Sequence, residues 1–361
     1  MQALEAWAPP VLQASYDNAG LLTGHDADPC TGVLCCLDVT EQVIEEALQK
    51  RCNLVVAHHP LIFGNVKKLT GNTGWERALI KAIKHDLAIY AIHTNLDQVL
   101  SGVNGKIASL LQLQDCRVLL PQQDVLKKLI TYVPIQHAES VRQALFHAGA
   151  GKIGGYSECS FSVEGEGTFT PGLASQPFVG ERGLRHSERE SRLEMLFPAH
   201  LESRLLEALR KAHPYEEVAY DIFLMQNTQA EVGAGLIGEL PAPVEEKLFL
   251  QMVAGTFRTG QIRHSALLGK PIRRVALCGG AGSFLISKAL SAQADLFLTA
   301  DLTYHDFFLA DDKLVLADIG HFESEQFTIE LLADFLAEKF HNFAVLKTSI
   351  STNPVHYLWH Q

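Results

Sequence analysis

Three apolar segments of this chain end in side chains that can bind a metal ion. The three groups are His58 with His59, His93 with Asp97, and His321 with Glu325. Imidazole and carboxylate groups are common ligands of divalent metals. One such pair is usually a solvated surface feature, whereas three pairs at the ends of three predicted strands indicate a shared metal site.

The histidine doublet follows the apolar run 54–57, which is typical of a strand buried on both faces. Pro60 cannot donate a hydrogen bond to a sheet, and it favours extended geometry at His59, so the strand must end there. Ligands of open α/β sheets bind beyond the carboxyl ends of the strands. The two imidazoles are therefore predicted at the ligand-binding edge of a sheet.

The C-terminal pair has helical spacing. His321 and Glu325 are four residues apart at the start of a predicted helix, so they share a face, with Cβ atoms about 5–6 Å apart. The amino end of a helix also favours the ionised form of Glu325. This arrangement suits one metal ion or a pair of ions.

The candidate ligands His58, His59, Asp97, His321 and Glu325 comprise three neutral imidazoles and two carboxylates. Two divalent ions held by this set would leave a charge of about +2, because the two carboxylates offset half of the charge of the ions. Five side chains do not fill two coordination shells, so positions remain open for water and an anionic substrate. Without thiolate ligands, Zn, Fe, Mn, Co and Ni all stay candidates.

The elements that position these residues predict an α/β fold. Strand and helix alternate from residue 33 to 111 and again from 274 to 350, which is typical of mainly parallel sheets covered by helices. Between them the predicted order is β-α-β-β-α-β, the ferredoxin-like signature. We therefore expect two α/β lobes, in residues 1–119 and 232–361, flanking an inserted ferredoxin-like α+β domain at 120–231.

Two details of the last third bear on the site. The glycine-rich stretch 233–235 is predicted to be the boundary that follows the insert. One long amphipathic helix is predicted to continue from the His321 region to about Phe340, and a strand at 345–350 to complete the last lobe.

The composition fits a folded protein with a large core, since 47% of residues are hydrophobic and 20% are charged. The net charge of −11 disfavours nucleic-acid binding, including a ring that threads nucleic acid. The start of the chain lacks a signal-peptide pattern, no stretch reaches about 18 apolar residues, and the seven cysteines form no C-x-x-C pair. We expect a cytoplasmic protein that does not enter a membrane.

Six motifs together resemble those of the GTP cyclohydrolase type 2 homologue family, also called the Nif-three-like dinuclear-metal family. They are SYDNAGL (15–21), LDVT (37–40), AHHPLIF (57–63), IHTNLD (92–97), CGGAGS (278–283) and GHFESE (320–325). Tyr16 and Ala19 stand where the family usually has tryptophan and valine. The resemblance implies that the five candidate ligands bind two divalent ions in a cleft between the lobes.

The resemblance also implies a toroidal homohexamer and an insert similar to CutA and PII-type domains. The insert carries the motif HPYEE (213–217), which we interpret as a bend before its last strand. His93 and His305 are predicted to transfer protons as catalytic residues or to be hydrogen-bond partners of the metal ligands, and the alternative is that they are plain loop histidines. Asp38 either orients a ligand or caps a helix, and the turn 279–282 is interpreted as a tight strand-to-helix connection.

Two functions fit these expectations. The first is a metal-dependent hydrolase, similar to GTP cyclohydrolase type 2, that activates water against an unknown anionic or nucleotide-like substrate. The alternative is a metal-trafficking or regulatory protein without turnover, in which open coordination positions serve the delivery of an ion and the insert senses a ligand.

Overall fold

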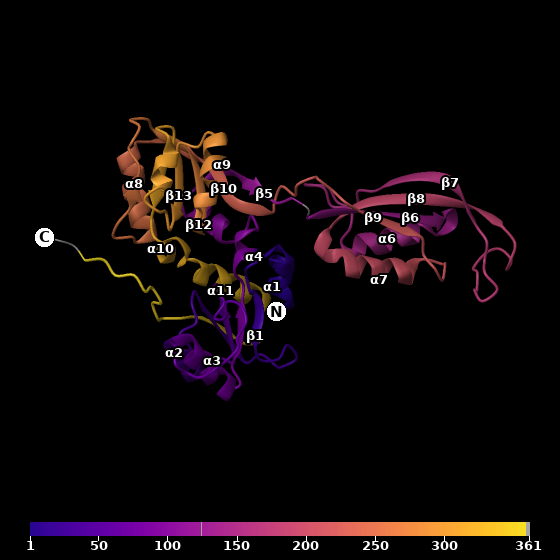
Figure 1. Ribbon diagram of the computed structural model, residues 1–361, viewed down its shortest axis with the longest axis horizontal. Coiled ribbons are helices and arrows are strands. Elements are labelled where there is room, and N and C mark those ends of the chain that lie inside the picture. The colour runs from indigo at the N-terminus through magenta and orange to yellow at the C-terminus, as the bar shows by residue number, and fades with distance from the viewer. Residues whose placement is uncertain (124, 359–361) are drawn as a thin grey trace. The chain divides into compact units, whose positions relative to one another are not determined.

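The computed structural model describes residues 1–123 and 125–358 (Figure 1). The chain divides into two compact units. Unit 1 contains Met1–Pro121 and Glu231–Gln361, and unit 2 contains Gln122–Ala230. Among the described residues, no helix is both long enough and apolar enough to cross a membrane.

The first sheet of unit 1 has five strands. In sheet order they are β1 (Gly20–Thr23), β4 (Ala88–Ala91), β3 (Leu54–Ala57), β2 (Gly32–Cys36) and β15 (Ala344–Lys347). All neighbouring pairs are parallel except β1 with β4. Strands β2 and β3 are almost entirely buried, as expected for apolar runs inside a parallel sheet.

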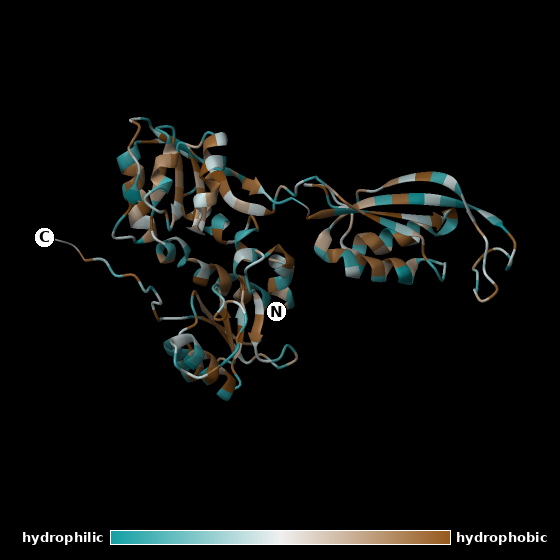
Figure 2. Ribbon diagram, in the orientation of Figure 1, coloured by the Kyte–Doolittle hydropathy of each residue, from teal (hydrophilic) through white to brown (hydrophobic). Residues whose placement is uncertain are grey.

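Helices α2 (Glu41–Gln49) and α3 (Gly74–Lys84) pack on this sheet, and side chains cap their amino ends. Helix α2 begins after Thr40, whose hydroxyl accepts a hydrogen bond from a backbone N–H of the first turn. Helix α3 begins with a capping box between Thr73 and Glu76. The apolar sides of both helices share one core with β2 and β3. Figure 2 shows the brown, apolar residues concentrated on the strands of unit 1.

The second sheet of unit 1 has six strands. In sheet order they are β11 (Arg263–His264), β14 (Val315–Asp318), β13 (Leu296–Ala300), β12 (Ile272–Ala281), β10 (Gly233–Val244) and β5 (Gln114–Pro121). The central strands β12, β13 and β14 are parallel, and the outer pairs are antiparallel. Its helices include α5 (Val103–Leu110), α8 (Glu246–Phe257) and α9 (Ile286–Ser291).

The glycine-rich stretch predicted as the boundary after the insert begins strand β10 at Gly233, and the division between the two units falls just before it, at Ala230 and Glu231. Gly233 pairs with Pro121 of β5, and a side chain at Gly233 would overlap the Leu120 carbonyl oxygen. The backbone at Gly233 has φ +154° and that at Gly235 has φ +63°. Glycine is therefore needed here for close strand pairing rather than for a flexible junction.

Two predictions for the last third need correction. The last strand, β15, joins the first sheet beside β2, so the C-terminal segment crosses from the second sheet to the first. The predicted long helix is two helices, α10 (His321–Glu325) and α11 (Thr328–Lys339). The break falls at Gln326, whose side-chain amide donates to the Phe257 carbonyl oxygen at 2.8 Å and so anchors the turn to α8.

Unit 2 has a four-stranded antiparallel sheet with two helices on one face (Figure 1). In chain order its elements are β6 (Leu126–Pro134), α6 (Ala138–Ala148), β7 (Phe161–Phe169), β8 (His186–Pro198), α7 (Glu202–Ala212) and β9 (Tyr220–Leu224). The order across the sheet is β7-β8-β6-β9. Alternate residues such as Val133 and Leu193 point toward α6 and α7 and form the core of the unit.

Candidate metal centre

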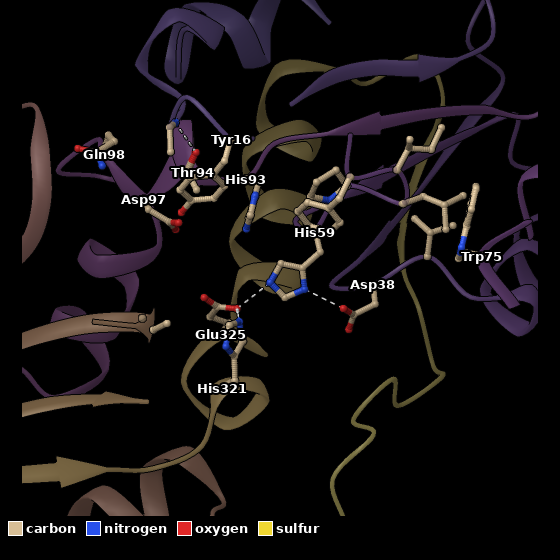
Figure 3. Close-up of a pocket in the computed structure, with 18 of the residues that line it drawn as sticks. Tyr16, Asp38, His59, Trp75, His93, Thr94, Asp97, Gln98, His321 and Glu325 are labelled. Atoms are coloured by element: carbon tan, nitrogen blue, oxygen red, sulfur yellow. Dashed lines mark hydrogen bonds and ion pairs between the residues drawn. The ribbon is translucent and has the colours of Figure 1, made fainter. Parts of the chain in front are cut away.

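Side chains from both sheets of unit 1 meet at one place (Figure 3). His58 and His59 follow β3, and His93 follows β4. Asp97 is the last residue of the short helix α4 (Thr94–Asp97). His321 and Glu325 are the first and last residues of α10, which follows β14 of the second sheet. All five predicted metal ligands, together with His93, therefore belong to one cluster of side chains.

The carboxylate of Glu325 lies at the middle of this cluster. Its Oε2 is 3.0 Å from Nε2 of His59 and 3.0 Å from Nε2 of His321. Its Oε1 faces a different group, with Nε2 of His58 at 3.9 Å. Oδ1 of Asp97 lies 3.7 Å from that same His58 nitrogen. The two oxygens of Glu325 thus face two separate sets of ligand atoms.

Two atoms of the cluster lack a hydrogen-bond partner among the described residues. They are Nε2 of His58 and Oδ1 of Asp97, and both atoms are buried. An unpaired buried polar atom is costly, on the order of 1–3 kcal/mol. Two donor atoms 3.7 Å apart can both approach a single cation at the usual distance of about 2.0–2.2 Å. The donor set therefore fits a divalent metal.

Each of the four histidines is oriented by a hydrogen bond at its Nδ1 atom. The partners are the carbonyl of Ile92 for His58 (2.9 Å), Asp38 for His59 (2.7 Å), Asp17 for His93 (2.8 Å) and Asp301 for His321 (2.7 Å). This arrangement leaves every Nε2 free to face the cluster. Hydrogen bonds of this kind fix the ring orientation and raise the basicity of metal-binding histidines.

Three aspartates lie behind the histidines, and two of them, Asp17 and Asp301, are additions to the predicted site. The prediction left two roles open for Asp38, and the contacts favour orientation, because Thr40 caps α2 while Asp38 bonds to His59. Asp17 and Asp301 were not singled out. Asp17 also accepts a hydrogen bond from the Thr94 backbone N–H at 3.0 Å, and so fixes the start of α4. A carboxylate inside the SYDNAGL motif was the only sequence signal for it.

The carboxylates set the protonation of the histidines. Burial lowers the pKa of His59, but Asp38 and Glu325 outweigh it and raise that pKa to about 9. Hydrogen bonds to Asp301 and Glu325 raise the pKa of His321 to about 11. Burial raises the pKa of Glu325, yet hydrogen bonds from the histidines hold it well below its usual value. Without a metal, protons on the histidines balance the charge of Glu325.

Burial and the nearby charge of Glu325 raise the pKa of Asp97 well above its usual value. Asp97 therefore stays protonated and neutral while Glu325 is ionised, because two negative charges this close together would repel each other. A cation placed between them would remove this repulsion. The charge pattern of the cluster thus agrees with the donor geometry.

Residues 279–282 were expected to form a tight strand-to-helix turn, but residues 279–281 continue strand β12, and this strand end supports Glu325 from the second sheet. Gly280 has φ +62°, and a side chain there would overlap Oε1 of Glu325. Its N–H donates to the Ser324 hydroxyl at 2.9 Å, and its carbonyl accepts from the Thr299 hydroxyl at 3.1 Å. The glycines therefore allow the end of β12 to approach α10 closely.

A cavity of about 1090 Å³ opens onto the cluster. His59, His93, Asp97, His321 and Glu325 line its inner end. The outer part is lined by exposed aromatic rings and two lysines, namely Tyr16, Phe63, Trp75, Phe284, Lys67 and Lys68. The cavity therefore offers a substrate both positive charge and flat apolar surfaces.

His305 does not share this position. It is exposed, and its ring packs against Tyr304 and Phe308, with ring centroids 5.2 Å and 6.3 Å away. Among the described residues that line the cavity, His305 is absent. Asp301, which follows β13, bonds to His321 of the cluster. His305 lies four residues later and precedes the 3-10 helix Asp306–Ala310. The structure thus places His93 in the cluster and His305 outside it.

Comparisons with known proteins agree along the whole chain. A family model described as Duf34/NIF3 (NGG1p interacting factor 3) matches residues 1–354. A Bacillus subtilis (strain 168) protein named GTP cyclohydrolase 1 type 2 homolog is 37% identical over 99% of this chain and 97% of its own length. The crystal structure of a Bacillus cereus protein related to NIF3 has 36% identity and a TM-score of 0.85 over 99% of this chain and 97% of that one. A Staphylococcus aureus crystal structure has 29% identity and a TM-score of 0.78, with the same coverage.

Proposed function

This chain belongs to the Duf34/NIF3 family, and on that premise we propose that it is a dinuclear metal-dependent hydrolase acting on an anionic substrate. One observation carries the proposal: Glu325 turns its two oxygens toward two different sets of ligand atoms. A carboxylate in this position can bridge two cations. A structural metal site would instead be closed by four protein ligands around one ion.

We assign His58, Asp97 and Oε1 of Glu325 to one ion, and His59, His321 and Oε2 of Glu325 to the other. Each set offers three ligand atoms, so both ions would keep positions for water and substrate. The ligands are nitrogen and oxygen atoms, which suit Zn, Fe, Mn, Co and Ni. When bound, such ions polarise a substrate oxygen and lower the pKa of water.

His93 is the residue placed to move a proton. Its Nδ1 is held by Asp17 at 2.8 Å, and the side chain of Asp17 is fully buried. The ring of His93 lies edge-on to those of His58 and His59, with centroids 5.3 Å away in each case. Its Nε2 therefore faces the centre, where it can accept a proton from water and return it to a leaving group.

The outer cavity supports an anionic, nucleotide-like substrate. Lys67 and Lys68 supply positive charge, and the rings of Tyr16, Phe63 and Trp75 supply flat surfaces on which a base can stack. The name of the Bacillus subtilis relative refers to GTP, which belongs to the same chemical class. We propose this substrate class without choosing a member of it.

A metal-trafficking or regulatory role without turnover is the alternative, and one observation favours it. The side chain of His321 is 40% exposed, so an ion held there would be accessible to an acceptor protein. We also propose that the chain is a cytoplasmic, toroidal homohexamer. In that assembly, the insert at 120–231 would be a ferredoxin-like, CutA/PII-like domain; the sheet order and element order of unit 2 support this assignment.

The decisive experiment combines metal analysis with a turnover screen. Protein purified without added metal is analysed for elements and then incubated with panels of nucleotides, phosphoesters and cyclic amides. The hydrolase proposal expects turnover that disappears after chelation and returns with one of the five metals. Absence of turnover in metal-replete protein, together with rapid transfer of the metal to an apo-acceptor, would favour the trafficking role instead.

A further inference from the structure

A second cavity, of about 620 Å³, lies in unit 2 on the sheet face without helices. Tyr132 and Arg192 pair across β6 and β8 and line this cavity. They alternate along their strands with Val133 and Leu193, which point into the core beneath the helices. The cavity is therefore built on the opposite side of the sheet from the core.

The HPYEE motif (213–217), interpreted from the sequence as a bend, also forms one wall of this cavity. Nε2 of His213 bonds to the Tyr132 carbonyl oxygen at 2.9 Å, and its Nδ1 accepts a hydrogen bond from the Tyr215 backbone N–H at 3.1 Å. The buried imidazole thus pins the turn to the sheet. As a result, Tyr215, Glu216 and Glu217 all line the cavity.

A buried carboxylate lies at the inner end. Glu190 is only 9% exposed, and its Oε1 accepts a hydrogen bond from the Tyr215 hydroxyl at 2.9 Å. Within the described chain, no lysine, arginine or histidine forms an ion pair with Glu190, and Arg192 pairs instead with Glu194 at 2.9 Å. A buried carboxylate is stabilised by a paired cation, and among the described residues Glu190 has none, since Arg192, which also lines the cavity, is paired with Glu194.

Two glycines of β7 keep space open beside this carboxylate. A side chain at Gly167 would overlap Oε2 of Glu190, whereas a Cβ at Gly165 would meet nothing within 4 Å. Gly165 pairs with Glu190 across the strands and lines the cavity. The strand therefore presents bare backbone where other residues would fill the cavity.

Aromatic rings complete the walls. Phe169 and Phe178 pack around Tyr215, with ring centroids 5.9 Å and 6.3 Å away, and both phenylalanines line the cavity. Aromatic faces attract cations, most strongly in sites from which water is excluded. Phenylalanine offers no ligand atom to a metal ion, so these walls suit a cation that has an apolar body.

We propose that this cavity binds an organic ammonium ion, a positively charged amino group carried on an apolar body. The ammonium group would pair with Glu190, and its apolar part would lie against the rings of Phe169, Phe178 and Tyr215. The carboxylates of Glu216 and Glu217 at the wall add negative charge, which disfavours anionic ligands. This site is separate from the metal centre and does not depend on it.

The test is a titration of the full-length chain with three amines, phenethylamine, choline and spermidine, followed by calorimetry or ligand-observed NMR. 2-Phenylethanol has the shape of phenethylamine without the charge and serves as the neutral comparison. We expect at least one amine to bind with a Kd of roughly 1 mM or lower, and 2-phenylethanol to bind at least about tenfold more weakly.

Glu190→Gln keeps the shape of the side chain and is expected to weaken amine binding at least about tenfold. Gly165→Val fills the open space and is expected to abolish binding while the circular dichroism spectrum is unchanged. Glu207→Gln is the matched control, because Glu207 is exposed on α7 and pairs with Lys211. That variant is expected to bind the amines as the native chain does.

Three results would overturn the proposal. The first is that no amine binds better than 2-phenylethanol, or that Glu190→Gln binds the amines as well as the native chain. The second is that Mn²⁺ alone binds in a manner that requires Glu190, which would make this an inorganic cation site. The third is that the amines do not bind while Gly165→Val lowers the association state in sedimentation, which would assign the cavity to an interface between copies.

Discussion

Glu325 lies 266 residues after His59 in the chain, yet its Oε2 atom is 3.0 Å from the His59 Nε2 atom. His59 follows a strand of the first sheet, and Glu325 ends a helix that follows a strand of the second sheet. Their contact joins the two sheets of unit 1 at the candidate metal centre. The centre can therefore form only when both sheets have folded against each other.

The first prediction concerns the number of ions. Asp97 faces only one of the two ligand sets, whereas Glu325 faces both. We expect Asp97→Asn to lower the metal content from two ions per chain to about one, and Glu325→Gln to lower it to nearly none. Elemental analysis after dialysis measures both values. Glu338→Gln, an exposed change on α11, is the control and should retain two ions.

Equal metal content in Asp97→Asn and in the native chain would contradict the assignment of Asp97 as a ligand. Loss of only one ion in Glu325→Gln would show that its carboxylate does not bridge. Thermal unfolding of each variant with and without metal separates loss of binding from loss of folding.

The second prediction concerns the positioning of His93 by Asp17. Removing a carboxylate that orients a histidine typically costs 10–100-fold in activity or metal affinity. Because His93 is outside the five assigned ligands, we expect Asp17→Asn to reduce hydrolysis about tenfold or more while both ions remain. Nitrogen-15 NMR of the imidazole rings should also show a changed tautomer for His93. A parallel loss of metal content would mean instead that His93 is a ligand.

The outcome for these residues shows where sequence reasoning succeeds and where it stops. The clustering of the five candidate ligands could be predicted because each follows an apolar strand or lies at helical spacing, and both signals are local. Asp17 and Asp301 were not predictable, since they act on histidines 76 and 20 residues away in the chain. Such a pairing depends on how the strands are ordered in the sheet.

The same limit explains the strand errors. The apolar run near Val345 predicts a strand but not the sheet that it joins, and β15 pairs with β2, more than three hundred residues earlier in the chain. The glycines at 233–235 predict a boundary near this point, but not the close approach of β5 that requires glycine at Gly233. Local sequence patterns therefore identified most helices and strands, whereas pairing between distant strands determined which sheet each strand joins.

The third prediction concerns proton release when metal binds. In the metal-free chain, the pKa of His59 is about 9 and that of His321 is about 11, so both are protonated at pH 7.5. Metal binding requires neutral imidazoles, so protons must leave and the apparent affinity must rise with pH. Calorimetry in phosphate and in Tris should give binding enthalpies that differ with the ionisation enthalpy of the buffer. Identical enthalpies in both buffers would contradict the prediction.

The last prediction concerns Glu46, which ties the C-terminal segment to α2. Its buried carboxylate accepts hydrogen bonds from the hydroxyl of Thr348, the N–H of Ser349 at 2.9 Å and Lys50 at 2.7 Å. Burial raises the pKa of Glu46, but these hydrogen bonds outweigh it and lower that pKa to about 2. A lowered pKa in the folded state means that the ionised group stabilises the fold above its unfolded pKa.

We expect this contribution, on the order of 2–3 kcal/mol, to be complete above about pH 4.5 and to be lost as the pH falls toward 2. Glu46→Gln should therefore lower the free energy of unfolding at pH 7, and its difference from the native chain should shrink at low pH. Urea denaturation at pH 7 and pH 3 measures this difference. Glu45→Gln, on the exposed side of α2, is the matched control. A difference that stays constant between the two pH values would mean that packing rather than ionisation of Glu46 holds the C-terminal segment.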